Sequence, residues 1–231
     1  MKKTKKFLFL SLLVLIPLTL FFGSKLPGRG YYLTSTLILI EIMLPFFLAF
    51  EGRKPQAREL VVIAVMCALA VASRVVIPIP NLKPTYAIIM ISAIAFGGET
   101  GFLIGAMTAL ASNFFLSQGA HTPWQMFAYG MAGLVAGVVF RKKWLPREPL
   151  SMAVFGAALV VLLVGPILDV SMFFIVQSKL TLTGFVAQCM SGLPMNLLLA
   201  AVTFLVLFFL GEPLLRKLDR VKLRYGMTEC K

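Results

Sequence analysis

The sequence has little of what catalysis or metal binding needs. It contains one histidine, His121, and three cysteines, with no cluster of histidine, cysteine and carboxylate at the spacing of a metal site. It has no Gly-x-x-x-x-Gly-Lys-Ser/Thr loop for ATP and no Gly-x-Ser-x-Gly serine elbow. We therefore expect no enzyme, no cofactor and no metal, which leaves binding, transport or scaffolding.

Charge is also scarce: 13% of the residues are charged and 59% are hydrophobic, too much apolar surface for a soluble core. Most of the apolar runs are long enough to cross about 30 Å of hydrocarbon as a helix. The run 85–97 is shorter and reaches only ~20 Å. The predicted membrane helices are 7–22, 31–49, 60–77, 85–97, 101–117, 123–140, 151–177 and 185–211.

The positive charges collect in alternate gaps between these runs. Of the 22 Lys and Arg residues, 17 lie before residue 7, in 53–58, in 141–147 or after 215. Only Lys25, Arg29, Lys83 and Lys179 lie in the other gaps. This positive-inside bias predicts a multi-pass protein with both termini cytoplasmic. The net charge of +13 then reports orientation and contact with anionic lipid, not nucleic acid.

The polar linker 51–59 separates two parts of the chain. Residues 1–50 hold two Leu/Phe/Ile-rich runs, typical of lipid-facing helices. Residues 51–231 hold six runs and a basic C-terminal tail, and are richer in small and isolated polar residues. We expect an all-α integral membrane protein, a six-helix domain with two additional N-terminal transmembrane helices.

Small residues recur every four positions in the second part, a spacing that lets membrane helices approach closely. We interpret the glycine ladders as packing inside the bundle. The alanine ladder opens the second part, so it is a candidate seat for a partner's helix. The ladders are Gly101, Gly105 and Ala109; Gly133 and Gly137; and Ala64, Ala68 and Ala72.

Several polar residues lie inside or near the outer ends of the predicted spans. Such residues are costly in hydrocarbon and normally face the interior or a cavity. Arg74 and Asp169 have a second interpretation, mutual neutralisation; Glu41, in the first part, is given no function. Thr122, Pro123 and Gln125 predict a helix start with a capping box, beside which Trp124 is a pocket residue or only an interfacial anchor.

The candidate ligand-binding side chains share the predicted outer side of the membrane. Their mixture of stacking and hydrogen-bonding groups suits a large, flat, polar ligand. They are Arg74, Asn81, Lys83, Tyr86, Asn113, Gln118, His121, Trp124, Gln125, Tyr129, Asp169, Gln188 and Asn196.

The order of these features resembles a known family. The basic linker, the alanine-ladder helix, Lys83-Pro84-Thr85, the Ala-Ser-Asn-Phe-Phe of 111–115 and the Thr-Pro-Trp-Gln-Met-Phe-Ala-Tyr-Gly of 122–130 are similar to the substrate-binding S components of energy-coupling-factor (ECF) vitamin transporters. The similarity covers about 57–215 and is closest to the cobalamin-type members. The two additional N-terminal helices depart from the six-helix family core.

The resemblance implies a vitamin-binding subunit in a prokaryotic cell membrane. It implies docking through Ala64, Ala68 and Ala72 on a membrane scaffold subunit carried by two cytoplasmic ATPases, which fits the missing ATP loop. We expect cobalamin or cobinamide as the ligand, with riboflavin, thiamine, biotin, folate or a queuosine precursor as alternatives. A secondary carrier and a ligand-free scaffold remain the competing functions.

Overall fold

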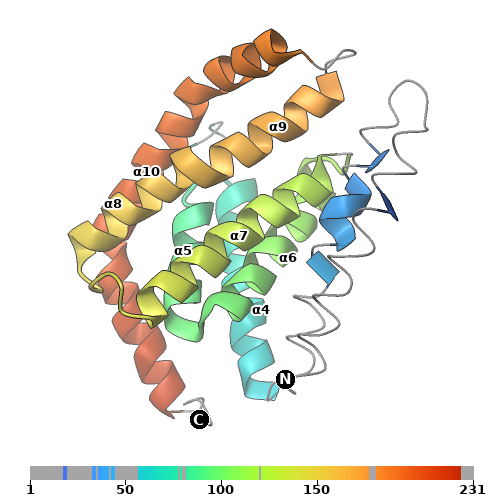
Figure 1. Cartoon of the computed structure of the whole chain (residues 1–231). Helices are drawn as coiled ribbons and strands as arrows, with labels where there is room; N and C mark the ends of the chain where they lie inside the picture. The colour runs from blue at the N-terminus through green and yellow to red at the C-terminus, as the bar shows by residue number, and fades with distance from the viewer. Residues whose placement is uncertain are drawn as a thin grey trace.

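The computed structural model describes residues 57–77, 79, 82–119, 121–176 and 181–224, with residues 18–19, 33–34, 36–41 and 43–44 of the N-terminal part. All the regular structure in these residues is helical (Figure 1). The helices are α4 (Ala57–Val75), α5 (Thr85–Phe96), α6 (Gly98–Leu116), α7 (Thr122–Arg141), α8 (Pro149–Leu159), the π-helix η2 (Val160–Val164), α9 (Gly165–Val176) and α10 (Leu182–Arg224).

The elements after residue 57 form six rods, because α8, η2 and α9 continue one another. Four of these rods are long and apolar enough to cross a membrane: α6, α7, the α8–η2–α9 rod and α10. The predicted runs from 60 onward are therefore confirmed as helices. The last helix extends further than expected: the predicted span stops at 211, whereas α10 continues to Arg224. The predicted spans 7–22 and 31–49 lie largely outside the described residues.

The short helix α5 is the centre of the bundle. Every one of its twelve residues is buried, and it packs between α4, α6 and α7 on one side and α10 on the other (Figure 1). Its last carbonyl groups, which a helix cannot satisfy itself, accept hydrogen bonds from cations of other segments. Lys222 Nζ donates to Ala95 O at 2.6 Å, and Arg147 Nη2 donates to Ile94 O at 3.3 Å. Burial within protein explains why so short a helix can lie at membrane depth.

Helices α6 and α7 make the most extensive contact among the described helices, and glycines allow their backbones to approach closely. A Cβ atom at Gly105 would lie 2.2 Å from the carbonyl oxygen of Tyr129, and one at Gly133 would lie 2.2 Å from the carbonyl oxygen of Gly101. One at Gly137 would lie 2.4 Å from the backbone nitrogen of Gly98. The prediction that the glycine ladders serve internal packing is confirmed.

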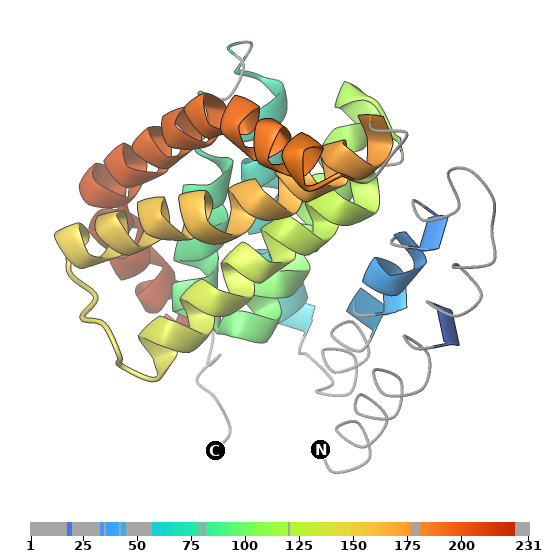
Figure 2. The same cartoon turned by 45° about the horizontal axis from the view of Figure 1, so that its top comes forward.

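The rod from α8 to α9 and the first part of α10 lie side by side over the remaining helices (Figure 2). The rod carries η2 at its middle, a π-helical turn of the kind often found at functional sites. Helix α10 contains Pro194 and Pro213, neither of which can donate a backbone hydrogen bond.

Part of the second N-terminal run packs on α6 and α7. Met43 is buried in a cluster with Phe102 and Ala106 of α6, and Met126 and Phe127 of α7 pack against that cluster. Glu41 accepts a hydrogen bond from Thr19 Oγ1 at 2.5 Å. The alanine ladder of α4 is not part of this cluster, and Ala64, Ala68 and Ala72 are all exposed.

Candidate functional site

A hollow of about 150 Å³ lies among five helices, at the end of the bundle where α4 ends and α7 begins. We call this end the pocket end, and the end that carries Arg141 to Arg147 and the last turns of α10 the basic end. The side chains that line the hollow come from α4, the residues before α5, α5 itself, α7, α9 and α10. They are Arg74, Lys83, Thr85, Tyr86, Gln125, Tyr129, Leu168 and Leu199.

Arg74, in the last turn of α4, is the buried cation of this hollow; it is only 8% exposed. Its Nη1 donates to Ser112 Oγ and to Asn113 Oδ1, the latter at 2.9 Å. Its Nη2 donates to Gln125 Oε1 at 3.0 Å. These bonds join α4 to α6 and α7, so the guanidinium is both a structural link and part of the wall.

Two tyrosines form the aromatic wall. The rings of Tyr86 and Tyr129 meet edge to face, with their centroids 4.7 Å apart, a favourable arrangement of two ring quadrupoles. The guanidinium carbon of Arg74 lies 5.2 Å from the centroid of the Tyr129 ring. The electron-rich ring face partly offsets the buried positive charge. A flat ring and a polar edge of a ligand would both find partners here.

The start of α7 differs from the predicted capping box. His121, not Thr122, is the N-cap, and no side chain caps it. The hydroxyl of Thr122 instead accepts from the backbone N–H of Gly119 and donates to Gln118. Asn113 Nδ2 donates to Thr122 Oγ1 at 3.0 Å and to Gln125 Oε1 at 2.9 Å. The capping prediction was wrong because buried donors on α4 and α6 use the same oxygens.

Asp169 does not neutralise Arg74. No ion pair joins the two within the described residues; Asp169 Oδ2 instead accepts from Asn196 Nδ2 at 2.9 Å, and both residues are buried. The helices α9 and α10 approach closely at this pair, since a Cβ atom at Gly192 would lie 2.2 Å from Asp169 Oδ1. The pair lies beside the hollow, because Leu168 precedes Asp169 and Leu199 follows Asn196 by one turn.

Trp124 is buried but does not line the hollow. Its ring lies 5.7 Å from that of Phe174 on α9, and Phe174 continues through Phe173 to Phe185 on α10. The indole Nε1–H has no hydrogen-bond partner in the described part of the chain. Trp124 thus closes the gap between α7 and α9 next to the hollow.

The structure brings five of the thirteen predicted ligand-binding residues together around the hollow: Arg74, Lys83, Tyr86, Gln125 and Tyr129. Asn113 lies behind them as a partner of Arg74. Gln118 is exposed and donates to the Leu110 carbonyl, while His121 and Gln188 are half-buried outside the lining. Asn81 lies outside the described residues.

Sequence reasoning missed Thr85, Leu168 and Leu199 as members of the lining. The sequence does carry a signal for Thr85, because it directly precedes the predicted pocket residue Tyr86. The two leucines have no such signal, because they look like every other apolar residue of their helices.

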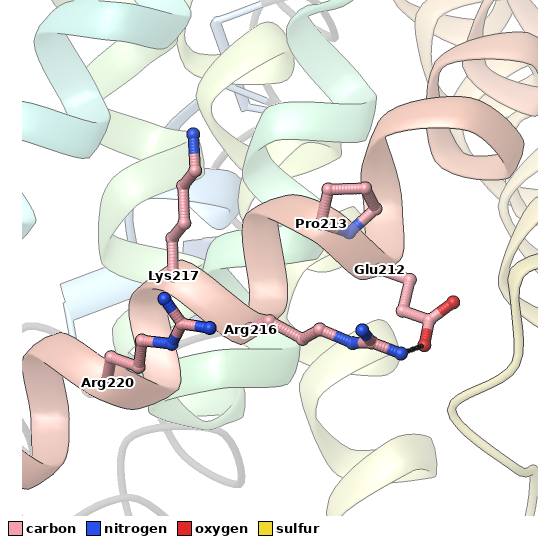
Figure 3. A pocket seen from close by; sticks show the side chains of 5 residues that line it. All are labelled: Glu212, Pro213, Arg216, Lys217 and Arg220. Atoms are coloured by element: carbon pink, nitrogen blue, oxygen red, sulfur yellow. Dashed lines mark hydrogen bonds and ion pairs between the residues drawn. The ribbon is translucent and has the colours of Figure 1, made fainter.

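A larger hollow, of about 260 Å³, lies at the basic end and is lined by one helix, α10 (Figure 3). Its residues are Glu212, Pro213, Arg216, Lys217 and Arg220. Arg216 forms an ion pair with Glu212 one turn earlier, and the three cations are exposed. We interpret it as a charged surface of the helix, not as a ligand site.

Comparison with known proteins gives one family. The family model of the ECF-type riboflavin transporter S component matches residues 54–216. Neither a curated protein nor a solved structure gives a significant match. The match begins and ends close to the 57–215 of the sequence resemblance, and it lends no support to the cobalamin-type likeness. The match covers most of the chain and includes the helices that form the hollow. The family is one of multi-pass membrane transport proteins and not of enzymes. The chain therefore belongs to the ECF-type riboflavin transporter S component family.

Proposed function

We propose that this chain is the subunit that captures riboflavin, or a flat vitamin of similar size, for an ECF importer. The observation that carries the proposal is the hollow at the pocket end, where Tyr86 and Tyr129 meet Gln125 and two cations. Tyrosines stack on a planar ring system, while amide and guanidinium groups pair with its carbonyl and hydroxyl edge. The family name supports riboflavin as the first ligand to test.

The size of the hollow favours a small vitamin. Ligand pockets usually measure about 300–1,000 Å³, so the 150 Å³ hollow must widen before a vitamin fits. Leu168 and Leu199, on α9 and α10, are the wall whose displacement would widen it. Cobalamin, the ligand expected from the sequence, is much larger than riboflavin. It is the second candidate because its nucleotide loop carries a phosphate that Arg74 and Lys83 can pair with.

Calorimetric titration of the purified full chain with riboflavin, cobalamin and thiamine tests the ligand. We expect a saturable isotherm with riboflavin. Tyr129→Leu should weaken it about two- to tenfold, because an aromatic pair contributes about 0.5–1.5 kcal/mol beyond buried area. Tyr129→Phe keeps the ring and is the matched control. An isotherm with cobalamin alone would replace riboflavin, and no isotherm with any vitamin would refute the binding function.

We further propose that transport requires docking of α4 on a scaffold subunit carried by two ATPases, since the chain has no ATP-binding loop of its own. Ala64, Ala68 and Ala72 form an exposed stripe along α4, whereas Met66, Ala70 and Arg74 of the same helix are buried. Small exposed side chains permit close approach of a second membrane helix. Met43, a described residue of the N-terminal part, packs on α6 and α7 and not on this stripe.

Substitution of the stripe separates binding from transport. Ala68→Trp should block the close approach and abolish vitamin uptake by cells that contain the whole importer, while the purified subunit still binds its ligand. Ala201→Trp, at an exposed alanine of α10, is the control and should leave uptake intact. Equal loss of uptake in both variants, or loss of binding with Ala68→Trp, would show that the stripe is not a docking site.

We propose the expected orientation and the expected N-terminal helices as well. The pocket end faces outward, the basic end faces the cytoplasm of a prokaryote, and residues 1–50 form two additional N-terminal transmembrane helices. The clustering of Arg141, Lys142, Lys143 and Arg147 with the cationic last turns of α10 at one end of the bundle supports the orientation.

A further inference from the structure

The hollow has an unbalanced charge. Arg74 is buried, yet its three hydrogen-bond partners, Ser112, Asn113 and Gln125, are all neutral. No described carboxylate forms an ion pair with it. A buried cation without a partner of opposite charge is strongly unfavourable, more so at membrane depth. The charge of Arg74 therefore needs a negative charge that none of its hydrogen-bond partners supplies.

The chain has few carboxylates to offer. Of its nine Asp and Glu residues, Asp169 and Glu41 are bonded to Asn196 and Thr19. Glu59 lies in the first turn of α4 and Arg74 in its last, about 22 Å apart by helix rise. Glu99 begins α6, whereas Asn113, the partner of Arg74, lies near its end. The others are Glu51 and Glu229, outside the described residues, and Glu148, Glu212 and Asp219, near the basic end.

A second cation lines the same hollow. Lys83 precedes α5, and no hydrogen bond or ion pair joins its amine to another described residue. Burial and the nearby guanidinium of Arg74 lower the pKa of Lys83. Two positive groups thus share one hollow with no acidic residue among its eight lining side chains. Like charges repel, so they would be held together at a cost unless an anion lies between them.

Arg74 also has donors to spare. A guanidinium carries five N–H groups, and the described contacts use both on Nη1 and one on Nη2. One N–H on Nη2 and the Nε–H remain. A charge-assisted pair of N–H groups matches the geometry of a phosphate or carboxylate.

We propose that the ligand of this hollow carries an oxyanion, a phosphate or a carboxylate, which Arg74 and Lys83 bind while Tyr86 and Tyr129 contact its ring. The inference rests on the proposed function, because it places the anion in the same hollow as the vitamin. It predicts selection of the phosphorylated form of a vitamin over the neutral form.

Inorganic phosphate is the probe that does not depend on the vitamin. Phosphate should raise the melting temperature of the purified full chain relative to chloride at equal ionic strength. Lys83→Gln should at least halve this rise. Asn113→Asp should remove most of it, because a carboxylate placed next to Nη1 supplies the missing negative charge from within.

Lys143→Gln is the control, since it makes the same change of net charge at an exposed residue of the basic end. A phosphate effect that is absent in the wild type, or equal in Lys83→Gln and Lys143→Gln, overturns the proposal.

Matched pairs of vitamins then test the preference. Riboflavin 5′-phosphate should bind at least tenfold more tightly than riboflavin, and the ratio of the two affinities should fall toward one in Lys83→Gln. Riboflavin that binds as tightly as its phosphate would overturn the anion site and leave the proposed function standing. If neither flavin binds, the riboflavin proposal fails. The anion site is then tested with cobalamin, whose nucleotide loop carries a phosphate, and with cobinamide, which lacks that loop. Equal affinities for the two would overturn the proposed anion site.

Discussion

Arg74 shows how one side chain serves both the fold and the site. It donates from α4 to Ser112 and Asn113 on α6 and to Gln125 on α7. Removal of any partner would leave a buried donor unsatisfied, at a cost of about 1–3 kcal/mol. The same contacts fix the position of the guanidinium over the Tyr129 ring. The geometry of the hollow is thus inseparable from the packing of these three helices.

Lys83 makes the stability of the ligand-free protein depend on pH. Its pKa lies below the usual 10.5 because of burial and the Arg74 guanidinium. Since the folded protein binds this proton less tightly than the unfolded chain, the protonated amine lowers stability below the folded-state pKa, and the loss disappears as the pH rises toward 10.5. Lys83→Gln should therefore raise the melting temperature at about pH 7, and by less as the pH rises. A gain that is constant with pH in thermal unfolding would contradict this.

Part of the site could be predicted residue by residue. Arg74, Gln125 and Tyr129 were found because a polar or aromatic group inside an apolar span must have a reason to be there. Trp124 met the same criterion but faces Phe174 on α9, because helix rotation decides which neighbour a side chain meets. Small residues lie on several sides of α6 and α7, so periodicity does not fix that rotation. Leu168 and Leu199 become wall residues only through the crossing of α9 and α10.

At the scale of the helices, contact between α6 and α7 positions the aromatic wall. Gly105 lies against the carbonyl of Tyr129, so the backbone beneath one wall residue is set by the absence of a side chain on another helix. Sequence spacing predicted this packing because glycines four residues apart lie on one face. It did not predict the full length of α10, whose apolar character weakens after 211 while its helical hydrogen bonds continue.

Gly105→Ala tests this contact. The new Cβ atom would lie 2.2 Å from the backbone oxygen of Tyr129, so one helix must move. We expect a loss of about 1–3 kcal/mol in stability, typical of overpacking, together with weaker ligand binding. Gly211→Ala is the control: its Cβ would meet only the end of the flexible Met152 side chain, at 3.2 Å. Equal losses in unfolding experiments on the two variants would show that the α6–α7 contact is not special.

At the scale of the whole molecule, charge divides the bundle into two ends. The basic end carries Arg141 to Arg147 and the cations of α10, while the pocket end carries the hollow. For the described residues, the gaps between apolar runs predicted this division, because loops at one end of an antiparallel bundle alternate along the chain; the orientation in the membrane stays a prediction. The hollow itself could not be predicted, since it arises where five elements leave space between them.

Cysteine labelling tests the orientation. In a variant without Cys67, Cys189 and Cys230, single cysteines at Leu82 and Thr181 should react with a membrane-impermeant reagent added to intact cells. Single cysteines at Arg53 and Lys143 should react only after the membrane is opened. Labelling of residue 143 in intact cells, with protection of residue 82, would reverse the topology and place the hollow on the cytoplasmic side.

The caps of α5 also set an order of assembly. Helix α5 is too short to be stable in lipid alone, and the amine that caps Ala95 belongs to Lys222, 127 residues later. Arg147, on the connection before α8, is synthesised first and can cap Ile94 of α5 early. The second cap of α5 forms only after α10 has been synthesised. In a ribosome-bound chain that ends before α10, the Ala95 carbonyl of α5 lacks its cap from Lys222. The end of α5 is therefore fully capped only once the basic C-terminal turns of α10 have been made and packed against it.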